Sequence, residues 1–378
     1  MELGRPRVAL CLPSIEMRTN RRTPAAVLSV AGLAALITAG CGGSSGTPAS
    51  GNETPHPLEI AQVREVGVVG APASVTARDV GATALLGTRL LWLFGDTLFR
   101  PRAVDGENLR TCTAATAEAA RPLETSEATD ANAAPFACMA FTPEEAAFNR
   151  TSGRADLRVA LWPGSVVPTA DGSGLVFYVK LTVNPGLLNY DVRGVGVARI
   201  APGATTAARD PGLVFQSPEP TLANASVFAG TVYAYGLIPG GQNVAVAMAP
   251  LAQAGSHDAY RFWNGSAWVA DARAAAPLFG GVSGALTVSY NAYLRRYLAV
   301  NSETLSGRVL MRVADHPEGP WGAPVLAFAG QAAAGTSSYA AREHAELAQD
   351  GGARVFVTYY RPAGGGFGDL RMMEVTFR

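Results

Sequence analysis

Two aspartates, Asp79 and Asp96, are the side chains in this sequence best suited to acid–base chemistry. Asp79 precedes the segment VGATALL, Asp96 follows the apolar segment LLWLFG, and both lie at nearly equal distances from a turn at Gly87 and Thr88. If the two segments pair as a hairpin, both carboxylates lie at the same end of it. Paired carboxylates hydrolyse glycosidic bonds, one as the acid and the other ionised. The alternative is structural, because Gly-Asp-Thr is common in turns and Asp79 could cap a loop.

The hairpin that carries these aspartates recurs along the chain. Apolar or alternating segments flank turns near residues 87, 172, 230, 292 and 350, and further strands are expected at 194–202, 243–250, 307–315 and 369–377. Apart from a longer first step, the repeat is about 60 residues, which predicts an all-β, five-bladed β-propeller. A β-sandwich would not need the same unit five times. Segment 58–70 is expected to add an outer strand to the last blade, and 258–272 an extra strand pair to the third.

Residues at the ends of the other hairpins are expected on the same rim as the two aspartates. They offer aromatic, amide, imidazole and guanidinium groups, which suit a sugar because its rings stack and its hydroxyls need donors and acceptors. The candidate substrate-binding residues are Trp162, Asn224, Asn301, His344, Tyr360 and Arg361. Each also has a structural reading, such as packing between blades for Trp162 or a satisfied core position for His344.

The N-terminal residues predict export. A basic patch precedes the small and apolar segment 25–40 and then Cys41, so residues 1–40 are interpreted as a signal peptide, with Met17 as a possible true start. TAGC resembles the lipobox of bacterial lipoproteins and predicts lipidation of Cys41, whereas the alternative is an ordinary signal peptide. Residues 41–57 then form a flexible linker to a domain at 58–378. The protein is expected to be a membrane-anchored lipoprotein facing the periplasm or the cell surface.

Charge, cysteines and the absence of known motifs indicate which ligands and cross-links to expect. Without residues 1–40 the chain has 25 basic and 28 acidic residues, which does not favour nucleic acid. Cys112 and Cys138 are expected to form a disulfide that staples an insertion at about 103–150. No metal-binding or nucleotide-binding motif is present, so no cofactor is expected; the carboxylates could hold a structural Ca²⁺, but no spacing demands it.

Four segments carry a resemblance to a known family: ARDVGATALLGTRLLWLFGDT, SYNAYLRRYLAVNS, RVADHPEGPW and YAAREHAELAQDGGARVFVTYYRP. They resemble exported bacterial proteins long described only as a domain of unknown function, whose characterised members are endo-D-arabinanases. The resemblance spans roughly residues 70–378. It implies a five-bladed propeller, similar to those of glycosidases acting on arabinans, xylans and fructans, with Asp79 and Asp96 as the catalytic pair.

One departure from such glycosidases leaves two functions open. Many place a general-acid Glu on the third blade, where this chain has Asn224, so any third carboxylate must come from Glu343 or Asp191. The first hypothesis is a surface-anchored glycoside hydrolase acting on an arabinan-like or other furanose-containing polysaccharide. The second is a propeller lipoprotein that binds a glycan or a protein without catalysis. In either case we expect a monomer that touches the membrane only through its lipid.

Overall fold

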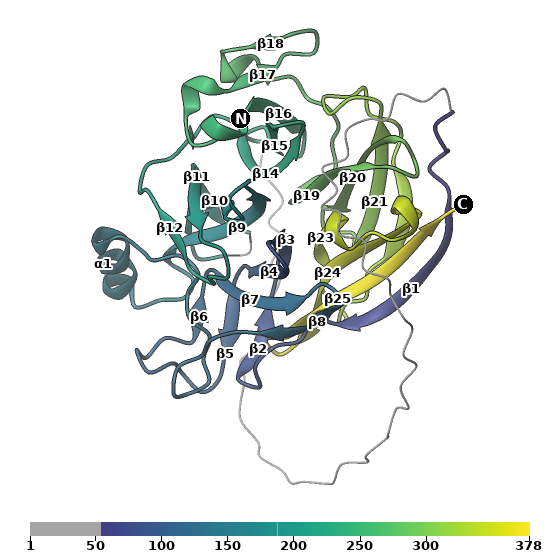
Figure 1. The fold of residues 1–378 in the computed structure, drawn as a ribbon. Helices are drawn as coiled ribbons and strands as arrows, with labels where there is room; N and C mark the ends of the chain where they lie inside the picture. Colours follow the sequence, from purple (N-terminus) through teal and green to yellow (C-terminus); the bar gives the residue numbers. More distant parts are fainter. Residues whose placement is uncertain (1–53, 187) are drawn as a thin grey trace, which may run out of the picture. The chain divides into compact units, whose positions relative to one another are not determined.

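The computed structural model describes residues 54–186 and 188–378, and the described chain is built almost entirely from antiparallel strands (Figure 1). The signal peptide, Cys41 and most of the expected linker lie outside these residues. No helix within the described ranges is long and apolar enough to cross a membrane.

The first sheet has the strand order β3-β4-β7-β8 and carries the first predicted hairpin. Its strands are β3 (Ala82–Leu86), β4 (Arg89–Phe94), β7 (Thr113–Glu118) and β8 (Arg121–Ser126). A small sheet beside it contains β2 (Val75–Arg78), β5 (Thr97–Phe99) and β6 (Leu109–Arg110). Strand β4 is apolar from Leu90 to Phe94 because both of its faces are buried there, so it does not show the alternation of a half-exposed strand.

The second and third sheets each have five strands. The second contains β9 (Arg158–Pro168), β10 (Gly174–Val183), β11 (Tyr190–Ile200), β12 (Ala207–Arg209) and β13 (Phe215–Gln216). The third contains β14 (Thr221–Phe228), β15 (Thr231–Leu237), β16 (Val244–Pro250), β17 (Arg261–Trp263) and β18 (Trp268–Val269). Strands β17 and β18 are the extra pair expected within 258–272. Short 3₁₀ turns lie at Leu251–Gln253, His257–Ala259 and Ala272–Ala274.

The fourth and fifth sheets have four strands each. The fourth contains β19 (Val282–Asn291), β20 (Arg296–Glu303), β21 (Arg308–Ala314) and β22 (Val325–Ala329). The fifth contains β23 (Tyr339–Glu343), β24 (Arg354–Gly364), β25 (Phe367–Phe377) and, paired with β25, the N-terminal strand β1 (Ile60–Val68). This pairing is the one expected for segment 58–70, and Figure 1 shows β1 running along β25.

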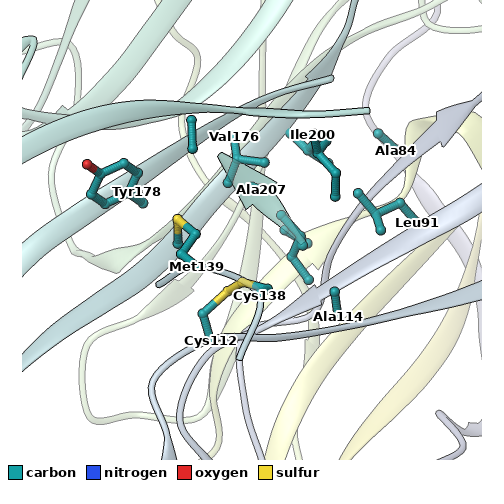
Figure 2. Packing of buried hydrophobic residues seen from close by; sticks show 14 of the residues in the cluster. Ala84, Leu91, Cys112, Ala114, Cys138, Met139, Val176, Tyr178, Ile200 and Ala207 are labelled. Atoms are coloured by element: carbon teal, nitrogen blue, oxygen red, sulfur yellow. A yellow bond between two sulfur atoms is a disulfide. The ribbon is translucent and has the colours of Figure 1, made fainter. Parts of the chain in front are cut away.

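Apolar clusters join each sheet to the next. Strands β3, β9, β14, β19 and β23 contact one another in this order. Figure 2 shows the cluster between the first and second sheets, where Leu91 faces Val176 and Ile200. Another cluster packs Trp92 and Phe94 of the first sheet against residues of the fifth. A propeller requires such an arrangement, and the count of five blades stays a prediction.

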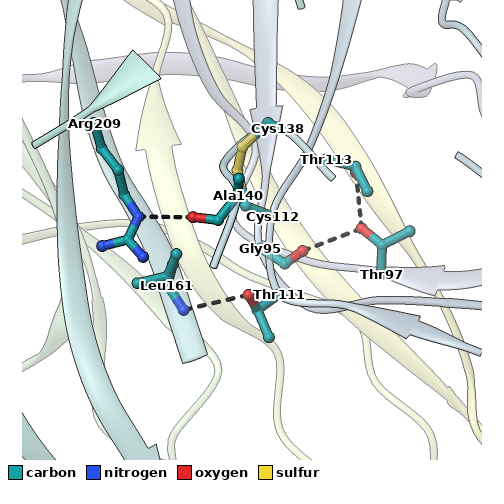
Figure 3. The surroundings of a disulfide bond; sticks show 9 residues. All are labelled: Gly95, Thr97, Thr111, Cys112, Thr113, Cys138, Ala140, Leu161 and Arg209. Atoms are coloured by element: carbon teal, nitrogen blue, oxygen red, sulfur yellow. Dashed lines mark hydrogen bonds between the residues drawn. A yellow bond between two sulfur atoms is a disulfide. The ribbon is translucent and has the colours of Figure 1, made fainter. Parts of the chain in front are cut away.

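The segment between the two cysteines is a structural part of the first sheet, which corrects the expectation of a stapled excursion. Strand β7 follows Cys112 directly and pairs with β4 along its whole length. The Cys112–Cys138 disulfide is confirmed and buried. The Ala207 N–H donates to the carbonyl of Cys138, as the Cys138 N–H does to that of Cys112. Figure 3 shows a further bond beside the disulfide, from Arg209 of β12 to the carbonyl of Ala140, so this segment connects the first two sheets.

Helix α1 (Pro143–Ser152) lies against the second sheet. Its N-terminus is closed by a capping box, in which Thr142 accepts from the Glu145 N–H and Glu145 accepts from the Thr142 N–H. Glu145 also forms ion pairs with Lys180 and Arg209. The helix is therefore held by charge and by its cap, in agreement with its largely polar sequence.

Candidate functional site

Asp79 and Asp96 lie opposite each other at the junction of the first sheet and the small sheet beside it. In the first sheet Ala82 pairs with Leu93, and in the small sheet Arg78 pairs with Thr97, so the same alignment holds on both sides of the unpaired residues 79–81 and 95–96. Residues directly opposite in an antiparallel pair project to the same face, with Cβ atoms about 5 Å apart. The hairpin expected from the sequence therefore brings the two carboxylates together.

The backbone beside Asp79 is held in an unusual conformation. Val80 has a φ of 73°, which is costly for a β-branched residue because its Cβ crowds the backbone. Such strain persists only where the surrounding structure enforces it, and it is common at functional sites. Here the enforcing contacts are the bond from the Gly95 N–H to the Asp79 carbonyl and the packing of Asp79 Oδ1 over Gly95.

Gly95 leaves the space that the Asp79 carboxylate occupies. A Cβ on residue 95 would lie 2.3 Å from Asp79 Oδ1 and 2.7 Å from a methyl group of Val80. Neither contact is possible for real atoms, so glycine is required by the close approach of the carboxylate. The Gly-Asp dipeptide at 95–96 thus makes room for one carboxylate and presents the other.

Asp79 accepts two hydrogen bonds. The Tyr339 hydroxyl donates to Asp79 Oδ2 at 2.8 Å, and the Asp96 N–H donates to the same carboxyl group. Tyr339 begins β23 of the fifth sheet, so this bond connects the last sheet to the first. Tyr339 is followed by Ala340 at a φ of 57°, which places backbone strain on both sides of the contact.

Asp96 has a cation and an indole as its partners. Arg158 Nη2 forms an ion pair with Asp96 Oδ2, and the Trp162 indole Nε1–H donates to Asp96 Oδ1 at 3.0 Å. Both partners come from β9 of the second sheet. The Asp96 side chain keeps 23% of its surface exposed, so the pair is accessible from solvent.

The insertion positions the start of β9, which carries Arg158. Asn149 of helix α1 donates to the carbonyl of Val159 at 3.2 Å and accepts from the Val159 N–H at 2.7 Å. Thr111, next to the disulfide, accepts from the Leu161 N–H at 3.2 Å (Figure 3). The segment that contains the disulfide and helix α1 therefore fixes the backbone of β9 between Arg158 and Trp162.

The two carboxyl groups sit in different electrostatic surroundings. Burial, and then the negative charge of Asp96, raise the pKa of Asp79 to about 7 against its two hydrogen bonds. Burial also raises the pKa of Asp96, but Arg158 and the Trp162 indole oppose this rise. The charges therefore favour a proton on Asp79 and an ionised Asp96, which is the asymmetry that acid–base chemistry at one bond requires.

Aromatic rings flank the two carboxylates on both sides. Trp162 makes an edge-on contact with Tyr190, with ring centroids 5.5 Å apart, and Tyr339 contacts Tyr360 at 5.0 Å. Tyr190 and Tyr339 are about 40% exposed. Exposed rings beside a polar centre suit stacking against sugar rings.

Three of the expected rim residues, His344, Asn301 and Asn224, are buried instead, which corrects their assignment to sugar binding. His344 is fully buried, with Nδ1 2.5 Å from the Thr83 hydroxyl and Nε2 2.8 Å from that of Thr358. Burial lowers the pKa of His344 to about 3. Asn301 is also fully buried and accepts a hydrogen bond from Arg312. None of the three side chains is available to a ligand at the rim.

The burial of His344 and of Asn301 has a common cause in the strand boundaries. The sequence predicted that the fifth hairpin begins at His344, but β23 ends at Glu343, and the segment that follows contains two 3₁₀ turns, Ala345–Leu347 and Asp350–Gly352. Glu343 and His344 therefore lie at the far end of β23 from Tyr339. Glu343 is buried against Ser289, and burial raises its pKa to about 7. Asn301 is two residues inside β20, which continues to Glu303.

The other expected residues occupy varied positions. Asn224 is buried in β14 and accepts from Arg342 at 3.0 Å. Arg361 pairs with Asp369, and Asp191 accepts from Asn184 at 3.1 Å on the surface. Trp162 contacts the acid pair directly through its bond to Asp96. Tyr360 lies next to the pair because it packs against Tyr339.

Three residues at the site were not expected from the sequence, namely Arg158, Tyr190 and Tyr339. Arg158 and Tyr339 are the first residues of β9 and β23, and both strands begin earlier than their apolar segments suggest. The first residues of both strands carry polar side chains that face the site. These residues therefore do not continue the alternation of apolar and polar side chains by which a strand is recognised in a sequence. Comparison of the first and last hairpins could have found Tyr339, because it lies at the start of β23 as Asp79 lies just before β3.

A pocket of about 870 Å³ lies elsewhere, between the second and third sheets. Its lining includes Asp171 of the β9–β10 turn, Gly230 of the β14–β15 turn and Arg199 of β11, and both turns lie at the opposite strand ends from the acid pair. Arg199 already pairs with Asp171 there. Over residues 54–186 and 188–378, no group of three or more His, Cys, Asp or Glu side chains is arranged to hold a metal ion.

Solved structures similar to this chain define the class of fold. A candidate hydrolase from Bacteroides ovatus has a TM-score of 0.60 at 13% identity, covering 81% of this chain and 87% of that one. The β-xylosidase RS223 has a TM-score of 0.52 at 12% identity, covering 84% and 96%. CoXyl43, a family 43 β-xylosidase/α-arabinofuranosidase from a compost metagenome, has a TM-score of 0.51 at 12% identity, with the same coverage. The chain therefore shares an all-β fold with glycoside hydrolases.

The sequence itself matches one family. Residues 209–357 match the domain of unknown function DUF4185. This range begins in β12 and ends in β24, so it includes Tyr339 but neither Asp79 nor Asp96. No curated protein sequence matches the chain.

Proposed function

We propose that this protein is a glycoside hydrolase acting on an arabinan-like or other furanose-containing polysaccharide. The observation that carries the proposal is the pairing of Asp79 and Asp96 in opposite electrostatic surroundings. Asp79, with its raised pKa, supplies a proton to the glycosidic oxygen as the bond breaks. Asp96, held ionised by Arg158, either attacks the anomeric carbon or activates a water molecule. The furanose preference rests on the resemblance to endo-D-arabinanases alone.

The aromatic residues supply binding in this proposal. Tyr190 and Trp162 lie on the Asp96 side, and Tyr339 and Tyr360 on the Asp79 side, so sugars can stack on either side of the bond to be cut. Stacking holds the substrate in position, which lowers the entropic part of the barrier. Asp191 and Glu343 have no direct part, because neither contacts the pair in the described structure.

The test is reducing-end release from a polysaccharide panel that includes D-arabinan and L-arabinan. The purified protein is compared with Asp79→Asn and Asp96→Asn, and with Asp258→Asn as a matched control on an exposed carboxylate. We expect both site variants to lose at least about 10²-fold in rate, the usual contribution of a positioned acid or base, while the control keeps full activity. Circular dichroism checks that each variant folds.

A second candidate is a propeller that binds a glycan without cleaving it. The observation that favours it is that Asn224 is a buried amide. The resemblance to propeller glycosidases leads us to expect a general-acid Glu on this third blade. Binding of the same polysaccharides without any turnover, unaffected by either Asp→Asn change, would support this candidate and remove the first.

We also propose that the protein is anchored by a lipid on Cys41 and faces the periplasm or the cell surface. The sequence motif at 38–41 supports this proposal. Metabolic labelling with a palmitate analogue should mark the native protein and leave Cys41→Ser unlabelled. Equal labelling of both would contradict the anchor without affecting the proposed activity.

A further inference from the structure

The pocket between the second and third sheets lies far from the acid pair and has no part in the proposed hydrolysis. Strand β9 connects the two places, because Arg158 at its start contacts Asp96, whereas Thr169, just beyond its end, lines the pocket. A strand of this length spans about 35 Å, so a small ligand in the pocket cannot reach the two carboxylates.

The pocket has room for a ligand. Its volume of about 870 Å³ lies within the range of small-molecule sites. One wall is the β14–β15 turn, where Gly230 has a φ of 77° and an added Cβ would meet no atom within 4 Å. The apolar part of the lining is aliphatic and includes Leu175, Val197 and Leu251.

The strand register places a guanidinium beside this apolar surface. Arg199 of β11 lies directly opposite Leu175 of β10, so the two side chains share a face of the second sheet. Arg199 Nη2 donates to Asp171 Oδ2 at 2.5 Å, and its other nitrogens make no hydrogen bond within the described chain. Because 54% of the side chain is exposed, these N–H donors are available to a ligand.

Asp171 is held in a fixed orientation beside Arg199. Its Oδ1 accepts from the Thr169 hydroxyl at 2.6 Å and from the Ser173 hydroxyl at 2.7 Å. These bonds hold the pKa of Asp171 well below its usual range, so the carboxylate stays ionised. Its Oδ2 accepts the bond from Arg199, and a carboxylate oxygen has room for a second donor.

A second carboxylate, that of Asp210, also lines the pocket. Asp210 Oδ1 accepts from the Gly212 N–H at 3.0 Å, and its Oδ2 has no hydrogen-bond partner among the described residues. Two carboxylates and one guanidinium give the lining a net negative charge, which disfavours an organic anion. Donors and acceptors beside an aliphatic surface instead suit a neutral compound with many hydroxyl groups.

We propose that this pocket is a second glycan-binding site, which holds a segment of neutral polysaccharide outside the part that is cleaved. Hydroxyls of the glycan donate to Asp171 and Asp210 and accept from Arg199. The C–H groups of its rings pack against Leu175 and Val197. Holding the polymer at two places raises its effective concentration at the acid pair. The identity of the glycan as an arabinan-like polymer rests on the proposed function.

The experiment measures retention of the full-length protein by D-arabinan and L-arabinan in native affinity gels. Asp96→Asn is the background, so that the polymers stay intact. Arg199→Met and Asp210→Ala change exposed residues and should fold, and each should weaken retention about tenfold, the loss expected for a hydrogen bond to a charged group. Arg121→Met and Glu118→Ala are the matched controls, because these residues form a similarly exposed ion pair at the β7–β8 turn.

Hydrogen exchange of the Asp96→Asn protein locates the glycan directly. Segments 169–175 and 210–214 should exchange more slowly when the polymer is present, and adding Arg199→Met should remove this protection. Unchanged exchange in both segments, or equal retention with and without Arg199→Met, would overturn the proposal. Turnover by the native protein without protection of the pocket would also overturn it and leave the hydrolysis in place. Protection of the pocket without turnover would keep the second site and remove the hydrolysis.

Discussion

Tyr339 and Asp79 are 260 residues apart in the chain, and their side chains form a 2.8 Å hydrogen bond. The bond joins the first residue of β23 to the residue that follows β2, and each of the two is followed by a residue with a positive φ. The acid pair is therefore completed only when the last sheet meets the first. Any catalysis by Asp79 depends on this contact between the ends of the domain.

Replacing Tyr339 with Phe should shift the pH dependence of activity. The hydroxyl stabilises ionised Asp79, so its removal raises the pKa of Asp79 further. A hydrogen bond worth about 1 kcal/mol corresponds to roughly 0.7 pH units. If Asp79 is the acid, the alkaline limb of the kcat/KM profile should move to higher pH by about this amount. Tyr190→Phe is the control, and a limb that stays in place or moves to lower pH would argue against the role.

Removing Arg158, the cation beside Asp96, should shift the acidic limb of the kcat/KM profile. In Arg158→Met the pKa of Asp96 rises, because Arg158 is the largest of the groups that lower it. Asp96 must be ionised to act, so the acidic limb of the profile should move to higher pH, and activity at pH 5 should fall more than at pH 7. The measurement is kcat/KM between pH 4 and 8.

The matched control for Arg158→Met is Arg154→Met. Arg154 lies four residues earlier and forms an exposed ion pair with Asp156, so its loss should leave the acidic limb unchanged. Arg158→Lys should restore part of the wild-type profile, because the charge remains but the planar donor is lost. Identical profiles for Arg158→Met and the native protein would mean that Asp96 is not controlled by this arginine.

Gly95→Ala should inactivate the protein while leaving most of its stability. The new methyl group would lie 2.3 Å from Asp79 Oδ1, so the carboxylate must move. We expect a loss of at least about 10²-fold in activity, since misplacement by about 1 Å has this effect. Gly255→Ala is the control, because no atom lies within 4 Å of its added Cβ. Full activity in Gly95→Ala would show that the position of Asp79 does not matter.

His344 should make the folded protein sensitive to acid. Its pKa is lowered to about 3 in the folded state, whereas the unfolded value is about 6.5. Below pH 6.5 His344 therefore binds a proton in the unfolded chain but stays neutral in the folded chain. The free energy of unfolding falls as pH decreases toward 3. Between pH 7 and pH 4.5 this linkage costs about 3 kcal/mol.

The test compares urea unfolding of the native protein and His344→Asn at both pH values. The variant is expected to be less stable at pH 7, because it loses bonds to Thr83 and Thr358, but to lose less stability on acidification. Asp79 and Glu343 have raised pKa values and contribute the opposite slope in both proteins, so their effect cancels in the difference. His316→Asn, at an exposed position, should follow the native protein. Equal slopes for His344→Asn and the native protein would contradict the linkage.

The hairpin of Asp79 and Asp96 was predictable because its information is local. Two apolar segments and one glycine turn set the register, and the register places both carboxylates at the same end. The third strands were also predictable from local signals. The pairing of β1 with β25 joins distant segments and was predictable only from the expected repeat, and the Cys112–Cys138 disulfide from the two cysteines left after the leader. The expected excursion at 103–150 was wrong where β7 and β8 form, because the Ala- and Thr-rich segment of β7 resembles a linker.

The amino-acid sequence alone therefore determined the class of fold, the turns and the pair of aspartates. The tertiary structure decided which groups surround that pair, because Arg158 and Tyr339 come from other sheets and from strand ends whose polar side chains hide the strand pattern. It also decided that His344 and Asn301 lie inside, since a shift of a few residues in a strand boundary moves a side chain from the rim to the core. Burial and long-range contact are properties of the packed sheets, and they give the two similar carboxyl groups different proton affinities.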